Sequence, residues 1–105
     1  MRPKFSYYRS ESHLRNVAAL DCQYCGAPGP SQASHSNKAA HGKGRGIKAS
    51  DKFTAALCPT CHRMVDESYS MTQEQRDAMW FVAHVKTQNA LVGRGQWPAG
   101  LTAED

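Results

Sequence analysis

The chain has 105 residues, enough for one small domain, and it contains four cysteines. Leu, Ile, Val and Phe make up 14 of these residues, about 13%, which is below the roughly 20% expected of a self-sufficient apolar core. A net charge of only +4, two Trp and four Tyr exclude a disordered chain, so we expect a structural metal to stabilise the thin core. The absence of a run of roughly 18 apolar residues excludes a membrane-spanning protein, and the absence of an apolar leader predicts a cytoplasmic location.

The first predicted element is a short helix over residues 10–20, which Ser10 can cap. We expect His13 on the surface of this helix. The narrow apolar stripe of the helix consists of Leu14, Val17 and Ala18. After a turn region rich in Gly and Pro, residues 31–35 are predicted to form a short strand that ends at His35.

The second half of the chain predicts one more strand and two more helices. Residues 53–57 form an apolar run between a charged loop and a cysteine, which favours a strand, and a helix is predicted over residues 59–66. The last helix, over about residues 72–92, has the clearest signals, because Thr72 begins a capping box and Gly93 is suited to end the helix. Its predicted core-facing residues are Ala78, Met79, Phe81, Val82, Val85 and Leu91.

The cysteines occur as two Cys-x-x-Cys pairs, Cys22 with Cys25 and Cys58 with Cys61. This spacing lets both thiolates of one turn reach a single ion about 2.3 Å away, and two such turns complete a tetrahedral site. The predicted cofactor is therefore one structural Zn²⁺, which has no open position for catalysis. A redox pair and free core thiols are the alternatives.

The positive charge is concentrated in residues 36–52, which hold five Lys or Arg and one acid and so carry the whole net charge of +4. Glycines alternate with other residues in this segment and allow the backbone to approach a ligand closely. Cations and exposed N–H groups suit phosphate, and a flexible solvated loop is the alternative interpretation. The predicted nucleic-acid-binding residues are Lys38, His41, Lys43, Arg45, Lys48 and Lys52.

A second group of side chains could hold a different metal ion. His62 directly follows Cys61, and Asp66 lies four residues later, so the two side chains would share one helix face and could bind a divalent ion. Taken alone, His62 could equally be a helix cap and Asp66 a solvated acid. His84, in the last helix, could be an ordinary half-buried histidine.

Together these features resemble the zinc-stapled HNH endonucleases. The order is Cys-x-x-Cys, a strand with a histidine, a loop, a strand, and Cys-x-x-Cys-His on a helix, over about residues 20–67. Residues 33–66 and 76–87 also resemble small phage and prophage nuclease-domain proteins. The resemblance implies a small α+β fold in one domain, residues 1–105: a ββα-metal core with a short N-terminal helix and a C-terminal packing helix.

The resemblance also implies roles for individual residues. His35 would be the general base, and His62 and Asp66 would ligate a catalytic ion such as Mg²⁺, Mn²⁺ or Ni²⁺. Related enzymes usually carry Asp, His or Glu directly before the base, where this chain has Ser34, so we expect His84, His41 or water to complete the metal shell. The central Asn that usually holds the base is missing here, and its nearest polar candidates are Asp51 and Thr54.

The predicted function is a phage- or prophage-encoded, metal-dependent HNH endonuclease, a hydrolase of phosphodiester bonds in DNA. Branched and single-stranded DNA are both possible substrates, and the bacterial host cytoplasm is the expected location. The alternative is a non-catalytic zinc-ribbon module that binds nucleic acid, and a third hypothesis is a structural zinc domain for protein contacts. The sequence leaves open the oligomeric state and whether the nucleic acid is DNA or RNA.

Overall fold

A computed structural model describes residues 7–99 and 101 of the chain. Within this part, the protein is a small α+β structure with three α-helices, one 3-10 turn and a two-stranded antiparallel sheet. The elements in chain order are α1 (Glu11–Ala18), β1 (Gln32–His35), η1 (Ala39–His41), β2 (Thr54–Leu57), α2 (Pro59–Glu67) and α3 (Gln73–Gly93). None of the helices described is long and apolar enough to span a bilayer.

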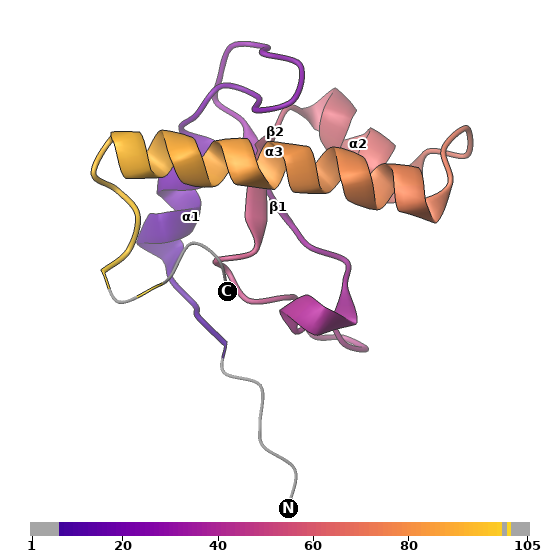
Figure 1. Cartoon of the computed structure of the whole chain (residues 1–105), viewed down its shortest axis with the longest axis horizontal. Coiled ribbons are helices and arrows are strands. Elements are labelled where there is room, and N and C mark those ends of the chain that lie inside the picture. Colours follow the sequence, from indigo (N-terminus) through magenta and orange to yellow (C-terminus); the bar gives the residue numbers. More distant parts are fainter. Residues whose placement is uncertain (1–6, 100, 102–105) are drawn as a thin grey trace, which may run out of the picture.

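The sheet lies behind α3, which crosses the whole molecule in Figure 1. Strand β1 pairs with β2 from Gln32 opposite Leu57 to His35 opposite Thr54, and every residue of β2 is buried. Helix α1 packs beside one part of the sheet and α2 beside another (Figure 1). The turn with the first cysteine pair and the segment 36–52 lie at opposite ends of the strands (Figure 1).

The core is thin, as its composition predicts, and it is divided between the two sides of β2. One cluster surrounds Ala55 and Leu57 and includes two of the cysteines, whereas Ala56 packs with Val17 and Leu91 on the other side. Alanines along β2 let the helices approach the strand closely but bury little apolar surface. A core of such small residues is consistent with a fold that depends on an additional stabilising element, such as a metal ion.

Polar side chains of α3 attach this helix to the sheet. The Trp80 indole N–H donates to the carbonyl of Ser34 at 2.9 Å, and the Thr87 hydroxyl accepts from the N–H of Ala56 at 3.0 Å. The His84 Nδ1–H donates to the carbonyl of Thr54 at 2.8 Å. These contacts satisfy backbone groups that a two-stranded sheet leaves unpaired, so α3 also protects the sheet edges.

The predicted inward face of α3 is confirmed at Met79 and Leu91 but is wrong at Ala78, Phe81 and Val82. The buried side consists of Met79, Trp80, Ala83, His84, Thr87 and Leu91. Phe81 and Val82 are instead 55% and 45% exposed. Because α3 is apolar around most of its circumference, apolar periodicity alone could not select a face, and the polar contacts to the strands decide the orientation.

Two smaller predictions also need correction. His13 is buried rather than exposed, because its ring lies edge-on to the rings of Tyr8 and Trp97, at 5.7 and 5.5 Å between centroids. Gly93 is the last helical residue of α3 and not the residue after it, and the positive φ of 68° occurs at Gly95. The remaining strand and helix predictions are confirmed to within a residue or two, including the capping box that Thr72 begins.

Candidate functional site

The four cysteines converge on one point, although Cys25 and Cys58 are 33 positions apart in the chain. Their Sγ atoms all lie within 4.8 Å of one another, and the Sγ atoms of Cys25 and Cys58 are 3.7 Å apart. A tetrahedral zinc site with Zn–S bonds of about 2.3 Å requires sulfur atoms about 3.8 Å apart. The cluster therefore fits one tetrahedral metal ion such as zinc.

Each cysteine pair has the same local geometry, which follows from its short turn. Cys58 is the N-cap of α2 and its Sγ accepts from the N–H of Cys61 at 3.4 Å, while Cys22 Sγ accepts from the N–H of Cys25 at the same distance. Burial opposes ionisation of Cys22, but the N–H groups of Cys25, Cys58 and Tyr24 lower its pKa to about 6. Burial and the neighbouring thiols raise the pKa of Cys61. Four thiolates this close together require a cation among them.

His35 lies at the end of β1 and contacts Asp51, with 2.8 Å between His35 Nε2 and Asp51 Oδ1. The side chain of Asp51 is only 6% exposed, and it also accepts from the backbone N–H of Ser10 at 2.8 Å and from Arg9 at 3.2 Å. Burial acts to raise the pKa of Asp51, but these three donors outweigh burial and lower it. Asp51 is therefore a carboxylate, and its contact makes Nε2 the protonated nitrogen of neutral His35.

The other ring nitrogen of His35 makes no hydrogen bond to any described residue, which leaves its lone pair available. His35 lines a cleft of about 590 Å³ between the start of α1 and the segment 36–52, together with Arg9, Lys48 and Asp51. Arg9 also donates to the carbonyl of Lys48 at 2.7 Å, so it joins the N-terminal segment to the basic segment. The result is a histidine inside a cleft that carries two cations, Arg9 and Lys48, and two acids, Asp51 and Glu11.

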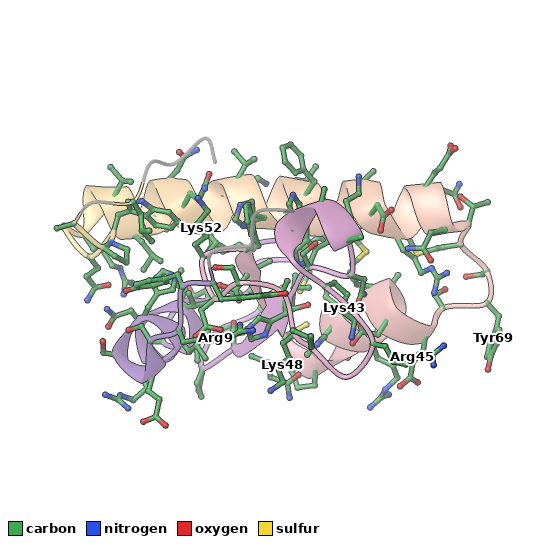
Figure 2. The ribbon with its side chains drawn as sticks, turned by 90° about the horizontal axis from the view of Figure 1, so that it is seen from below. Arg9, Lys43, Arg45, Lys48, Lys52 and Tyr69 are labelled. Atoms are coloured by element: carbon green, nitrogen blue, oxygen red, sulfur yellow. The ribbon has the colours of Figure 1, made fainter. Side chains whose placement is uncertain are left out.

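The basic side chains divide into two groups. Arg9, Lys43, Arg45 and Lys48 lie on the side of the molecule away from α3, whereas Lys52 lies nearer to α3 (Figure 2). Lys52 Nζ stands 5.1 Å from the centre of the Phe53 ring. Lys38 is exposed but borders a different hollow, one between the segment 36–52 and α3.

His41 is packed at the base of the segment 36–52. Its ring stacks on Phe53 at 4.1 Å between centroids, and its Nδ1 lies 2.6 Å from the hydroxyl of Ser36. Burial, with help from the charges of Lys38 and Lys52, lowers the pKa of His41. These contacts suit a structural role for His41 better than the predicted contact with phosphate.

His62 and Asp66 lie on one face of α2, as the sequence predicts, with 3.2 Å between Nε2 and Oδ2. His62 Nδ1 is 2.7 Å from the amide oxygen of Gln32 and donates there, so Nε2 faces the carboxylate of Asp66. A proton on Nε2 makes this contact an ion pair, and a bound metal ion could take the place of that proton. A divalent ion with adjacent ligands about 2.1 Å away places them about 3.0 Å apart, so the pair fits such an ion.

The structure does not bring His84 to this pair. His84 is 4% exposed, and its ring stacks on Trp80 at 4.7 Å. Among the described residues, no third His, Cys, Asp or Glu lies close enough to share an ion with His62 and Asp66. The prediction of His84 as a third ligand is therefore wrong, because its Nδ1 is committed to the backbone of β2.

Two amide side chains border the His62–Asp66 pair, and the sequence pattern pointed to neither. Gln32 contacts His62, and Asn37 donates to the second oxygen of Asp66 at 3.2 Å. His35 lies between Gln32 and Asn37 in the chain, so α2 runs along the strand that carries His35. Ser34 is fully buried and cannot reach a metal ion at the surface.

Arg9 is the other functional candidate that sequence reasoning missed. It precedes the predicted first helix by one residue and contacts groups about 40 residues later in the chain. No local pattern marks it, because its importance depends on the return of the segment 36–52 to the start of α1.

Comparisons with known proteins add one finding. A family model described as "Protein of unknown function (DUF968)" matches residues 1–95. No curated protein matches the chain, and no solved structure does either.

Proposed function

The chain belongs to the DUF968 family, and we propose that it is a metal-dependent endonuclease of the HNH type that hydrolyses phosphodiester bonds in DNA. The contact between His35 and Asp51, inside a cleft that Arg9, Lys48 and Glu11 also line, carries this proposal. A buried carboxylate that holds an imidazole in one tautomer is the arrangement of a general base. A histidine with a purely structural role does not require a buried carboxylate that fixes its tautomer.

His35 would take a proton from the attacking water at its free Nδ1, while Asp51 keeps the proton on Nε2 and stabilises the imidazolium that forms. Lys48 would bind a phosphate oxygen beside His35 and help to position the scissile bond, while Arg9, whose guanidinium already donates to Asp51 and to two backbone carbonyls, would add positive charge at the cleft. Such contacts orient the backbone without reading bases, which suits a nuclease with little sequence preference.

His62 and Asp66 would hold the catalytic ion, with the amide groups of Gln32 and Asn37 beside them. One imidazole and one carboxylate suit Mg²⁺, Mn²⁺ or Ni²⁺. When bound, the ion would supply charge stabilisation to the phosphate and the leaving oxygen. The cysteine cluster would hold a separate structural Zn²⁺ with no open position.

A non-catalytic zinc-ribbon module that binds nucleic acid is the second candidate. The observation that favours it is the short ligand set at His62 and Asp66, which lacks a third ionisable ligand among the described residues. This candidate offers no reason for the His35–Asp51 contact. Both candidates predict the same binding of DNA by Arg9 and the basic segment, so only cleavage separates them.

The test is cleavage of plasmid and branched DNA by the zinc-loaded protein with added Mg²⁺, Mn²⁺ or Ni²⁺. His35→Ala should lower the cleavage rate by about 10² to 10⁴, the usual contribution of a general base, and leave DNA affinity unchanged. Asp51→Asn is a matched probe of similar size, and its amide N–H would favour the wrong tautomer of His35. No cleavage by the wild type favours the binding module, and equal cleavage by His35→Ala contradicts the assignment of the base.

A further inference from the structure

Ile47 is an exposed apolar residue in a segment that is otherwise basic and rich in glycine. Its side chain is 46% exposed, and Arg45 and Lys48 lie within two residues of it in the chain. Turns favour Gly, Pro, Asn, Asp and Ser, so a β-branched apolar residue in such a place needs an explanation. Other exposed apolar side chains, such as those of Met64 and Val92, lie on helices and do not line the cleft of His35.

The turn that carries Ile47 is tight and closed by hydrogen bonds. The N–H of Gly44 donates to the carbonyl of Ile47 at 3.0 Å, and the N–H of Ile47 donates to the carbonyl of Gly44 at 3.1 Å. Gly46 has a φ of 70° inside the turn, a conformation that residues with a side chain rarely adopt. The backbone that presents Ile47 therefore has a defined shape. We call residues 43–48 the basic turn.

Both ends of the basic turn are attached to the N-terminal segment. The Tyr7 hydroxyl donates to the carbonyl of Gly42 at 2.7 Å, directly before the turn. At its other end, Arg9 Nη2 donates to the carbonyl of Lys48 at 2.7 Å. A side chain on a support that is fixed at both ends loses little conformational entropy when it binds a partner.

The charges around Ile47 select an anionic partner. The basic turn holds Lys43, Arg45 and Lys48, all exposed, and no acid. These three side chains lie on the side of the molecule away from α3 (Figure 2). Glu11, which also lines the cleft, would repel phosphate, so the phosphates of a bound nucleic acid should lie toward the basic turn. A partner that combines phosphates with apolar sugar and base surfaces fits both the cations and Ile47.

Ile47 also borders the cleft that contains the candidate base. Gly46, Ile47 and Lys48 line the same cleft of about 590 Å³ as His35, and Leu14 of α1 adds a second apolar side chain to it. A nucleic acid that contacts Ile47 therefore lies beside His35 as well. This placement connects the apolar contact to the phosphate that would be cleaved.

We propose that Ile47 is a wedge that enters the minor groove of duplex DNA and unstacks one base step beside His35. The proposal rests on the DNA binding proposed above, and it names the preferred substrate as a duplex with a step that unstacks easily, such as a mismatch. Apolar side chains of minor-groove proteins insert in this way, and flanking Lys and Arg suit the negative potential of the groove. Unstacking kinks the backbone at that step and turns its phosphate toward the cleft.

The test is binding of the full zinc-loaded chain, without a second metal ion, to two labelled duplexes that differ only by a single central mismatch. Unstacking costs least at a mismatch, so the wild type should bind the mismatched duplex at least about tenfold more tightly than the matched one. 2-Aminopurine placed beside the mismatch should gain fluorescence on binding, because it loses a stacked neighbour.

Ile47→Ala removes the wedge and should bring the ratio of the two affinities close to one, while the slope of log affinity against log salt stays unchanged because no cation is lost. Ile47→Leu should keep the preference, since a side chain of similar volume still fills the step. Lys48→Ala should do the reverse of Ile47→Ala: it should reduce the salt slope by roughly 0.9 and keep the preference. Val92→Ala is the matched control, because Val92 is a 54% exposed apolar residue on α3, and it should bind both duplexes like the wild type.

Equal binding of the two duplexes by the wild type overturns the wedge, and so does a preference that survives Ile47→Ala. Tighter binding of the single strand than of either duplex overturns it as well. These results do not depend on cleavage, because the second metal ion is left out. A chain that prefers the mismatch but never cleaves DNA with added Mg²⁺, Mn²⁺ or Ni²⁺ keeps the wedge and overturns the nuclease proposal, whereas a chain that binds no DNA overturns both.

Discussion

Four thiols meet at one candidate metal site of this protein, whereas one imidazole and one carboxylate meet at the other. The cysteine cluster joins the turn after α1 to the start of α2 and includes two buried residues. His62 and Asp66 lie one helical turn apart on α2, and both are partly open to solvent. A closed tetrahedral set can hold a fold together, while an open pair leaves positions for water and substrate. The two sites share α2, so one helix carries both kinds of chemistry.

Loss of the cysteine cluster should have the largest effect. A structural zinc supplies roughly 10–16 kcal/mol of binding free energy, which matches or exceeds the roughly 5–15 kcal/mol that stabilises a typical domain. Cys58→Ser, or a strong chelator, should therefore unfold the chain, as measured by circular dichroism during heating. His62→Ala removes a ligand of the open pair only and should leave the melting temperature nearly unchanged. A metal-free chain that melts cooperatively at the wild-type temperature would contradict the structural role of the cluster.

The basic side chains of the segment 36–52 should control affinity for DNA without stabilising the fold. Replacing Lys43, Arg45 and Lys48 together with Ala should reduce the slope of log affinity against log salt by roughly 0.9 for each phosphate that the variant no longer neutralises. Titrations at several salt concentrations measure this slope. Lys86→Ala is the control, because Lys86 lies on α3 outside the cleft and should leave the slope unchanged. An unchanged slope in the triple variant would place the DNA-binding face elsewhere.

A smaller effect is expected at His13, which belongs to neither candidate metal site. Neither ring nitrogen of His13 makes a hydrogen bond of normal geometry among the described residues, and burial lowers its pKa despite the charge and the nearby backbone of Asp51, which both act to raise it. His13→Phe keeps a ring between Tyr8 and Trp97 and removes two unsatisfied polar atoms. It should raise the free energy of unfolding by about 1–2 kcal/mol at neutral pH. Thermal or denaturant unfolding measures the change.

The same variant should also change the acid sensitivity of the fold. A histidine with a lowered pKa in the folded state stabilises the fold above its ordinary pKa of 6.5 and loses this contribution as the pH falls below 6.5. His84 and His41 have lowered pKa values for the same reason, burial, and contribute with the same sign. His13→Phe should therefore flatten the decline in stability below pH 6.5 in excess zinc. If the free energy of unfolding declined equally below pH 6.5 in the wild type and in His13→Phe, His13 would not be a cause of the acid sensitivity.

Local signals in the sequence were sufficient to predict most elements and the closed site. Ser10, Thr72 and the two Cys-x-x-Cys turns act within a few residues, so their contacts can be inferred without the fold. The partner of His35 could be narrowed from the sequence to two polar candidates near the expected position, Asp51 and Thr54. The structure selects Asp51 over Thr54, whose hydroxyl donates to the carbonyl of Asp51 instead.

Long-range contacts account for what the sequence could not predict. Arg9 contacts Asp51 and lines the cleft of His35 only because residues 48–51 return to the start of α1. His84 looked available to a metal, but its ring belongs to the face that α3 turns toward β2. That face could not be selected from periodicity, because α3 carries apolar residues on both sides and polar groups such as Thr87 decide the orientation.

The most direct test of the two-site account is a titration of the zinc-loaded protein with Mn²⁺, followed by electron paramagnetic resonance and calorimetry. The account predicts that one Mn²⁺ binds per chain while the zinc content stays at one. Asp66→Asn and His62→Ala should each abolish or greatly weaken Mn²⁺ binding without loss of zinc, and His84→Gln should bind Mn²⁺ like the wild type if it folds. A protein that binds no Mn²⁺, or whose Mn²⁺ binding survives both His62→Ala and Asp66→Asn, would contradict an open metal site on α2.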